Sequence, residues 1–189
     1  MNSIIEAVKK GEINASLDVV ISNNPEAKGL ETAKEHGIDT KAFDLNSYTS
    51  RAEFDLAIIK FLKPRNIDLV VLAGYMLLVG ADFVSAYKSN MINIHPSLLP
   101  SFIGRRPHQQ ALDYGVKLAG CTVHFVTEGL DDGPIIMQAA VPLLEDDNEA
   151  SLAARVLKEE NRILPECVNL IVEGKVKFKR SIRHEKSIN

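Results

Sequence analysis

The sequence has only two cysteines among its 189 residues, Cys121 and Cys167, and they form no C-x-x-C pair. So few cysteines exclude a disulfide framework, and we expect both to be reduced thiols in the core. No apolar run approaches the ~20 residues of a membrane span, and the N-terminus lacks the basic-then-apolar pattern of a secretory signal. These absences predict a cytoplasmic protein without a membrane partner.

Net charge is also small. A formal charge of −3 leaves no overall basic surface, so the composition predicts no nucleic-acid partner. The basic stretch 175–186 is expected to be a solvated terminus rather than an RNA-binding arm. An anionic ligand would need positive charge gathered locally.

Several common motifs are missing. No G-x-G-x-x-G or G-x-x-x-x-G-K-[ST] occurs, which gives dinucleotide and P-loop binding no support. The five histidines show no H-E-x-x-H or comparable spacing, so we expect no metal. Ser97 follows His95 closely but lacks a G-x-S-x-G elbow, and it is read as a turn residue.

The apolar content and the pattern of apolar residues indicate an α/β fold in one domain covering residues 1–189. An apolar content of 46% suffices for a sizeable core. Apolar runs of strand length alternate with segments of helical period, which favours a mainly parallel central sheet flanked by helices. Strands are predicted at 17–22, 40–43, 68–73, 91–95, 121–126 and 134–142. Helices are predicted at 2–10, 25–36, 51–62, 81–87, 108–114 and 148–172, the last kinked or divided at Pro165.

The segment 93–100, NIHPSLLP, carries an amide and an imidazole at the end of an apolar run. Asn93 and His95 are two residues apart, so both side chains point to the same side of an extended strand. Pro96 cannot continue a strand inside a sheet, which predicts that the pair lies at a strand end. Ligands bind at strand ends in open α/β sheets. Asp131 adds a carboxylate in the turn-rich segment 131–134, DDGP.

These three side chains suit the attack of an amine on a carbonyl. The Asn93 amide can donate to an oxygen that gains negative charge, and His95 can exchange a proton near neutral pH. A carboxylate beside the histidine favours its charged form. Taken singly, each residue is equally typical of a turn or a helix cap. Their combination favours catalysis.

The segments 93–100, 122–130 (TVHFVTEGL) and 130–136 (LDDGPII) resemble the folate-dependent formyltransferase family, in particular the branch that acts on glycinamide ribonucleotide. The resemblance implies a Rossmann-like domain and formyl transfer from 10-formyltetrahydrofolate, as co-substrate, to the amine of that ribonucleotide in purine synthesis. It implies that Asn93, His95 and Asp131 are the catalytic residues. It also implies small-molecule substrates only, and a monomer or homodimer.

The resemblance also implies binding roles for the residues that match the family pattern. Folate would contact Arg51, Met76, Leu77, Leu78, Val79, Asn93, Thr127, Glu128, Gly129, Leu130 and Asp131. The ribonucleotide would contact Pro96, Leu157 and Glu160. From the residues alone, Arg51 and Glu160 could equally be solvated side chains, and 76–79 would be read as core.

Some positions depart from the family pattern. Arg106 stands where relatives often have histidine, and Leu157 where they often have a polar side chain. Relatives begin with an apolar strand and a glycine-rich loop that binds the phosphate through backbone amides. We expect this strand and loop to be absent from 1–189, because the sequence begins inside the helix that follows them.

Three alternatives stay open at this point. A formyltetrahydrofolate hydrolase would use water in place of the amine, and relatives of that kind carry an extra N-terminal domain. A transfer-RNA formyltransferase would need a further C-terminal domain. A folate- or nucleotide-binding module without turnover is the alternative from a different class.

Overall fold

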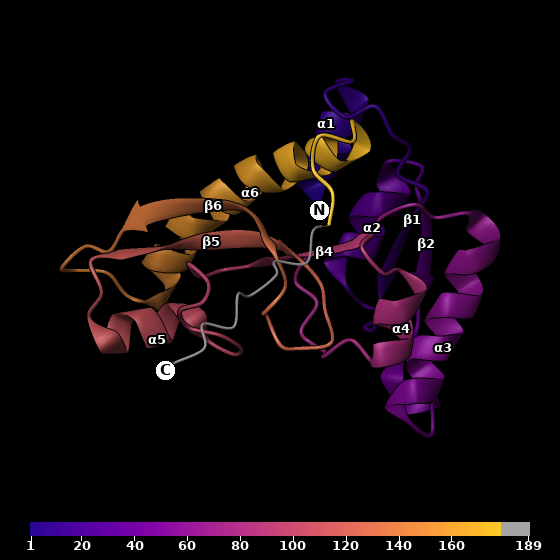
Figure 1. The fold of residues 1–189 in the computed structure, drawn as a ribbon, viewed down its shortest axis with the longest axis horizontal. Coiled ribbons are helices and arrows are strands. Elements are labelled where there is room, and N and C mark those ends of the chain that lie inside the picture. Colours follow the sequence, from indigo (N-terminus) through magenta and orange to yellow (C-terminus); the bar gives the residue numbers. More distant parts are fainter. Residues whose placement is uncertain (179–189) are drawn as a thin grey trace, which may run out of the picture.

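Figure 1 shows the fold in a computed structural model, which describes residues 1–178. Most of the basic stretch 175–186 therefore lies outside the described residues. In chain order the elements are α1 (Asn2–Lys9), β1 (Val19–Ser22), α2 (Lys28–Glu35), β2 (Asp39–Ala42), α3 (Arg51–Leu62), β3 (Val70–Leu72), α4 (Ala81–Ala86), β4 (Met91–His95), α5 (Pro107–Tyr114), β5 (Leu118–Phe125), β6 (Ile135–Pro142) and α6 (Glu149–Val172). Each predicted strand and helix is present, which confirms the α/β class.

The strands form a parallel pair, β1-β2, and a four-stranded sheet of order β3-β4-β5-β6. Strands β3 and β4 are parallel, whereas β5 runs antiparallel to both of its neighbours. Strands β3, β4 and β6 therefore share one direction, in agreement with a mainly parallel sheet. The reversed β5 was not predicted, because a fully buried strand has the same apolar pattern in either direction.

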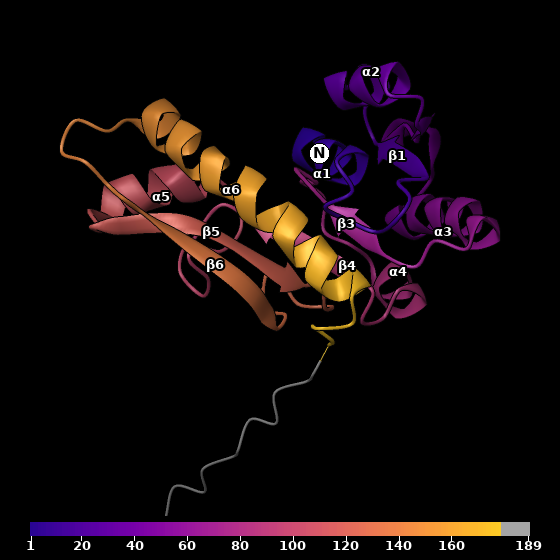
Figure 2. The ribbon, with the colours of Figure 1, turned by 90° about the horizontal axis from the view of Figure 1, so that it is seen from above.

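Helices cover the two groups of strands and close two cores. Helix α6 lies along β5 and β6 and also contacts α1 and α5 (Figure 2). Helices α3 and α4 pack together beside the other core, around Phe54, Ile58 and Phe83. The free thiols of Cys121 and Cys167 are buried in the first core, as predicted, and burial raises the pKa of both to about 12.

Local hydrogen bonds explain where the helices begin. Helix α3 starts as predicted because the Ser50 hydroxyl accepts from the Glu53 N–H at 3.2 Å. Helix α2 begins at Lys28 rather than at residue 25, since Asn24 Oδ1 accepts from the Glu26 N–H at 3.0 Å and holds that segment in a turn.

Pro165 does not divide the last helix. Helix α6 runs without interruption from Glu149 to Val172 and includes Pro165. Proline removes one N–H and leaves the carbonyl of residue 161 without its helical partner. Residue 161 is exposed, so water can solvate that carbonyl, while Ile163, Leu164 and Cys167 stay buried and hold the helix on the sheet.

Candidate active site

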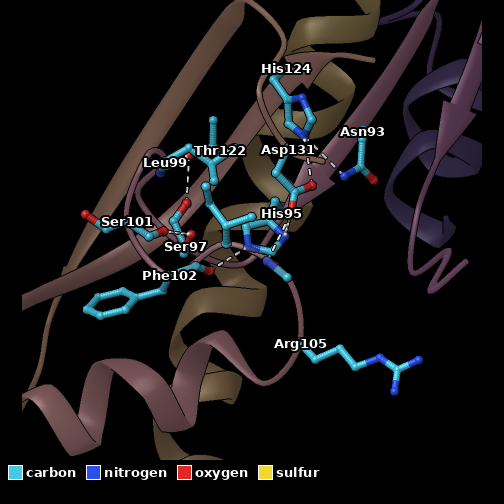
Figure 3. A network of polar contacts seen from close by, with 12 residues as sticks. Asn93, His95, Ser97, Leu99, Ser101, Phe102, Arg105, Thr122, His124 and Asp131 are labelled. Atoms are coloured by element: carbon cyan, nitrogen blue, oxygen red, sulfur yellow. Dashed lines mark hydrogen bonds and ion pairs between the residues drawn. The ribbon is translucent and has the colours of Figure 1, made fainter. Parts of the chain in front are cut away.

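Strand β4 carries Asn93 and His95 at its C-terminal end (Figure 3). It ends at His95, directly before Pro96, as the sequence predicts. In the antiparallel ladder with β5, Asn93 lies opposite His124 and His95 lies opposite Thr122. Opposed residues of neighbouring strands point to the same face, so one face of β4 and β5 gathers all four side chains. His95 is buried and Asn93 is half-buried.

The His95 ring faces an acceptor at each nitrogen. Its Nε2 lies 3.0 Å from the Phe102 carbonyl oxygen, and its Nδ1 lies 3.5 Å from Asp131 Oδ2. A carbonyl only accepts, so Nε2 carries a proton. A second proton on Nδ1 would face the carboxylate. Both ring nitrogens therefore face groups that can accept a hydrogen bond.

Asp131 reaches this position from the loop between β5 and β6. Its backbone adopts a positive φ of 51°, and its side chain is only 10% exposed. Besides facing His95, Oδ2 accepts a hydrogen bond from the Gly104 N–H at 3.2 Å. The carboxylate thus connects the β5–β6 loop to the segment that follows Phe102. The structure brings the three residues predicted as catalytic into one cluster.

The segment between β4 and α5 is fixed by Thr122. The buried Thr122 hydroxyl donates to the Ser97 carbonyl at 2.7 Å and accepts from the Leu99 N–H at 3.1 Å. Gln138 Nε2 also donates to it, at 2.9 Å. Ser97 donates to the Ser101 carbonyl at 2.6 Å, which agrees with its interpretation as a turn residue. These bonds hold the segment whose Phe102 carbonyl contacts His95.

Arg51, predicted as a folate contact, opens helix α3 and is held in place by two neighbours. Its Nε donates to Asp55 Oδ1 at 2.9 Å, and its Nη2 donates to the Tyr75 hydroxyl at 2.8 Å. Asp55 is buried and its Oδ2 accepts from the Gly80 N–H at 2.8 Å. Burial raises the pKa of Tyr75 to about 12, so its hydroxyl stays neutral. The remaining guanidinium N–H groups can bind an anionic or polar ligand.

The two loops predicted to enclose the folate differ in exposure along their length. In the first loop, Met76 and Leu78 are 80% and 60% exposed, whereas Val79 is buried. Leu77 is partly buried against the core around Phe54. In the second loop, Leu130 is 52% exposed, Glu128 and Gly129 are exposed, and Thr127 is half-buried. Exposed apolar side chains on two loops offer a surface for a flat aromatic ligand.

The residues predicted for the ribonucleotide are more scattered. Pro96 is half-buried and follows His95 directly. Leu157 and Glu160 lie on α6, where Leu157 is 52% exposed. Burial raises the pKa of the Glu160 carboxyl, an effect that the nearby Met1 amino group partly opposes. Glu160 therefore lies close enough to the Met1 amino group, at the start of α1, for the two charges to interact. Arg106 forms an exposed ion pair with Glu149 at 3.1 Å.

Sequence reasoning overlooked His124 and Asp55. His124 lies in the segment 122–130, but the sequence alone predicts no role for it. Its contact with Asn93 depends on the antiparallel register of β4 and β5, which the apolar pattern does not encode. For Asp55, the spacing of four residues from Arg51 on a predicted helix was an available signal.

Comparison with known proteins gives these residues a context. Residues 1–168 match the formyl transferase family. The chain belongs to that family. The Escherichia coli phosphoribosylglycinamide formyltransferase is 40% identical over 178 residues, which cover 94% of this chain and 84% of that protein. A glycinamide ribonucleotide transformylase from Symbiobacterium toebii has a TM-score of 0.92 and 47% identity, covering 94% of this chain and 84% of that one.

Longer proteins share this family domain. The human trifunctional purine biosynthetic protein adenosine-3 is 42% identical over 94% of this chain, but the chain spans only 18% of its length. A formyltetrahydrofolate deformylase from Pseudomonas syringae is 29% identical with a TM-score of 0.86, covering 93% of this chain and 58% of that one.

Residues 1–178 hold neither a metal-binding group of side chains nor a membrane-spanning helix. No three His, Cys, Asp or Glu side chains gather there where they could hold a metal ion. No helix in that range is both long and apolar enough to cross a bilayer.

Proposed function

We propose that this chain transfers a formyl group from 10-formyltetrahydrofolate to the amine of glycinamide ribonucleotide in purine biosynthesis. One observation carries the proposal: Asn93, His95 and Asp131 converge at the end of β4 in a chain whose relatives are named phosphoribosylglycinamide formyltransferase. An amide donor, an imidazole and a carboxylate within reach of one another match the needs of amine attack on a formyl carbon.

In the proposed mechanism, the amine attacks the formyl carbon directly and no covalent enzyme intermediate forms. The formyl oxygen gains negative charge, which an Asn93 N–H and the charged His95 stabilise. The amine loses a proton as it forms the new C–N bond, and His95 helps to pass a proton to the folate nitrogen as the C–N bond to folate breaks. Asp131 faces His95 Nδ1 at 3.5 Å and favours the charged ring throughout.

The binding assignments extend the proposal. The folate contacts are Arg51, Met76, Leu77, Leu78, Val79, Asn93, Thr127, Glu128, Gly129, Leu130 and Asp131, and the ribonucleotide contacts are Pro96, Leu157 and Glu160. The folate set is supported by the guanidinium held beside Tyr75 and by the exposed side chains of Met76 and Leu78. The three ribonucleotide contacts are supported by the resemblance to the family.

The direct test is a turnover assay with both substrates present. We expect Asn93→Ala and His95→Ala each to reduce kcat by about 10²–10³, the usual loss when one oxyanion donor is removed. His36→Ala is the matched control, because His36 lies at the end of α2 with its Nδ1 hydrogen-bonded to Lys9, outside the proposed catalytic cluster, and its loss should leave turnover unchanged. Wild-type turnover in His95→Ala would refute the mechanism.

A deformylase is the second candidate, because a formyltetrahydrofolate deformylase shares the fold at 29% identity. Water would then attack the same formyl carbon, and the proton transfers would be unchanged. Measuring folate deformylation with and without ribonucleotide separates the two activities. Turnover that needs the ribonucleotide supports the transferase, whereas equal turnover without it supports the hydrolase.

The remaining assignments describe the surroundings of the enzyme. We propose that residues 1–189 act as one formyltransferase domain in the cytoplasm, as a monomer or homodimer, on small molecules only, without a metal, nucleic acid or membrane. Two buried free thiols are consistent with a reducing compartment. Light scattering coupled to size exclusion, performed on the full chain, measures the oligomeric state.

A further inference from the structure

His124 is buried beside the catalytic cluster, yet the mechanism above does not use it. Both of its ring nitrogens are engaged. Nδ1 lies 2.9 Å from the Phe125 carbonyl oxygen, and Nε2 lies 3.2 Å from Asn93 Nδ2 (Figure 3). A buried histidine that contacts an oxyanion donor directly can control how that donor is presented.

The two partners determine where the proton of His124 resides. The Phe125 carbonyl can only accept, so Nδ1 must carry the proton. The Asn93 NH2 group can only donate, so Nε2 must offer its lone pair. His124 is therefore neutral, with its proton on Nδ1. Burial lowers the pKa of His124, which agrees with a neutral ring.

This arrangement determines the orientation of the Asn93 amide. One N–H of Asn93 points to His124 Nε2, and the NH2 group, rather than the carbonyl, lies on the side of Asp131 and His95 (Figure 3). The second N–H remains available for a ligand oxygen. A proton on His124 Nε2 would instead require the Asn93 carbonyl at this place and would turn the NH2 group away.

The surroundings of His124 act on its pKa in opposite directions. Asp131 Oδ1 lies 3.7 Å from Nε2 and, together with Asp132, favours a charged ring. Burial and the nearby His95 oppose that charge. A neutral His124 does not form an ion pair with Asp131, whose Oδ2 faces His95 Nδ1 at 3.5 Å.

We propose that His124 is a positioning residue: as a neutral, Nδ1-protonated imidazole it accepts from Asn93 and orients the Asn93 N–H toward the formyl oxygen. The backbone supports this role. A Cβ at Gly133 would lie only 1.7 Å from the Phe125 carbonyl oxygen, so glycine lets the β5–β6 loop pass over the group that fixes the His124 tautomer. This inference rests on the proposed function for its kinetic test only.

The kinetic test is a double-mutant cycle in the full chain. His124→Phe keeps the ring volume and removes the acceptor, and we expect kcat to fall about 10-fold with both KM values within about twofold of wild type. His124→Gln restores an acceptor oxygen and should recover part of the rate. In the Asn93→Ala background, His124→Phe should change kcat by less than about twofold, because the residue on which it acts is gone.

Two results of this cycle would overturn the proposal. The first is a full additional loss in the Asn93→Ala background, which would mean that His124 acts independently of Asn93. The second is a wild-type kcat in His124→Phe. A parallel cycle with Asp131→Asn distinguishes action through the carboxylate: non-additivity with Asp131 but not with Asn93 would also refute the assignment.

An NMR measurement needs no substrate and therefore separates this inference from the proposed function. Ring ¹⁵N shifts of His124 in the wild-type chain should report a neutral Nδ1–H tautomer at pH 7, and one Asn93 side-chain proton should shift in His124→Phe. An Nε2–H tautomer, or a charged His124 ring at pH 7, would refute the inference even if the enzyme is active.

Discussion

Thr122→Val is the sharpest test of how the segment between β4 and α5 is held in place. The change keeps the shape of the buried side chain but removes the hydroxyl that bonds Ser97, Leu99 and Gln138. The Leu99 N–H and the Ser97 carbonyl then lose this partner away from water, and each such loss costs about 1–3 kcal/mol. Gln138 still donates to the Leu99 carbonyl, at 2.9 Å, which limits the total.

We therefore expect Thr122→Val to lower the free energy of unfolding by about 3 kcal/mol. For a domain of this size that corresponds to a decrease in Tm of roughly 6–12 °C. Turnover should fall as well, because the same segment carries the Phe102 carbonyl that orients His95. Thermal melts followed by circular dichroism, with urea titrations at 25 °C, measure the stability.

Thr122→Ser is the matched control, since it keeps the hydroxyl and removes one methyl group, at a cost of about 1 kcal/mol. It should therefore retain most of the stability and turnover that Thr122→Val loses. A Thr122→Val protein that melts within 2 °C of wild type, or above Thr122→Ser, would refute the reasoning, where 2 °C is roughly the effect of 1 kcal/mol.

Asp131→Asn keeps size but removes the charge that faces His95, so kcat at pH 7 should fall by about 10²; unchanged turnover would argue against the electrostatic role. Asp55→Ala removes the carboxylate that accepts from Arg51 and from the Gly80 N–H, and should raise KM for the folate more than KM for the ribonucleotide. Asp82→Ala on α4 is the control. Equal changes in both KM values would count against a role of Asp55 in folate binding. Burial lowers the pKa of His108 and His124 below the ordinary value of 6.5. Below pH 6.5 the unfolded chain therefore binds protons that the folded chain does not. The free energy of unfolding should be highest above pH 6.5 and should decline as the pH falls through the lowered pKa values. Urea midpoints at pH 7.5, 6.5 and 5.5 measure this, and the decline should be shallower in His108→Asn.

The sequence by itself determined the class of fold and the position of Asn93 and His95 at the end of a strand. Apolar runs of strand length, a proline after His95 and the Ser50 cap set the ends of β4 and α3, because these signals act over a few neighbouring residues. The short segment 93–100 likewise set Asn93 and His95 on one face of a strand end, since that outcome depends only on the period of an extended chain.

Only the tertiary structure decided which residues meet. The antiparallel register of β5 brings His124 to Asn93 and Thr122 to the segment after His95, and a loop with positive φ delivers Asp131 to His95. Buried strands carry no local signal for direction or register, and contacts between distant segments follow from backbone pairing and packing. The protonation of His124 depends in turn on those contacts, so no local reading of the sequence could supply it.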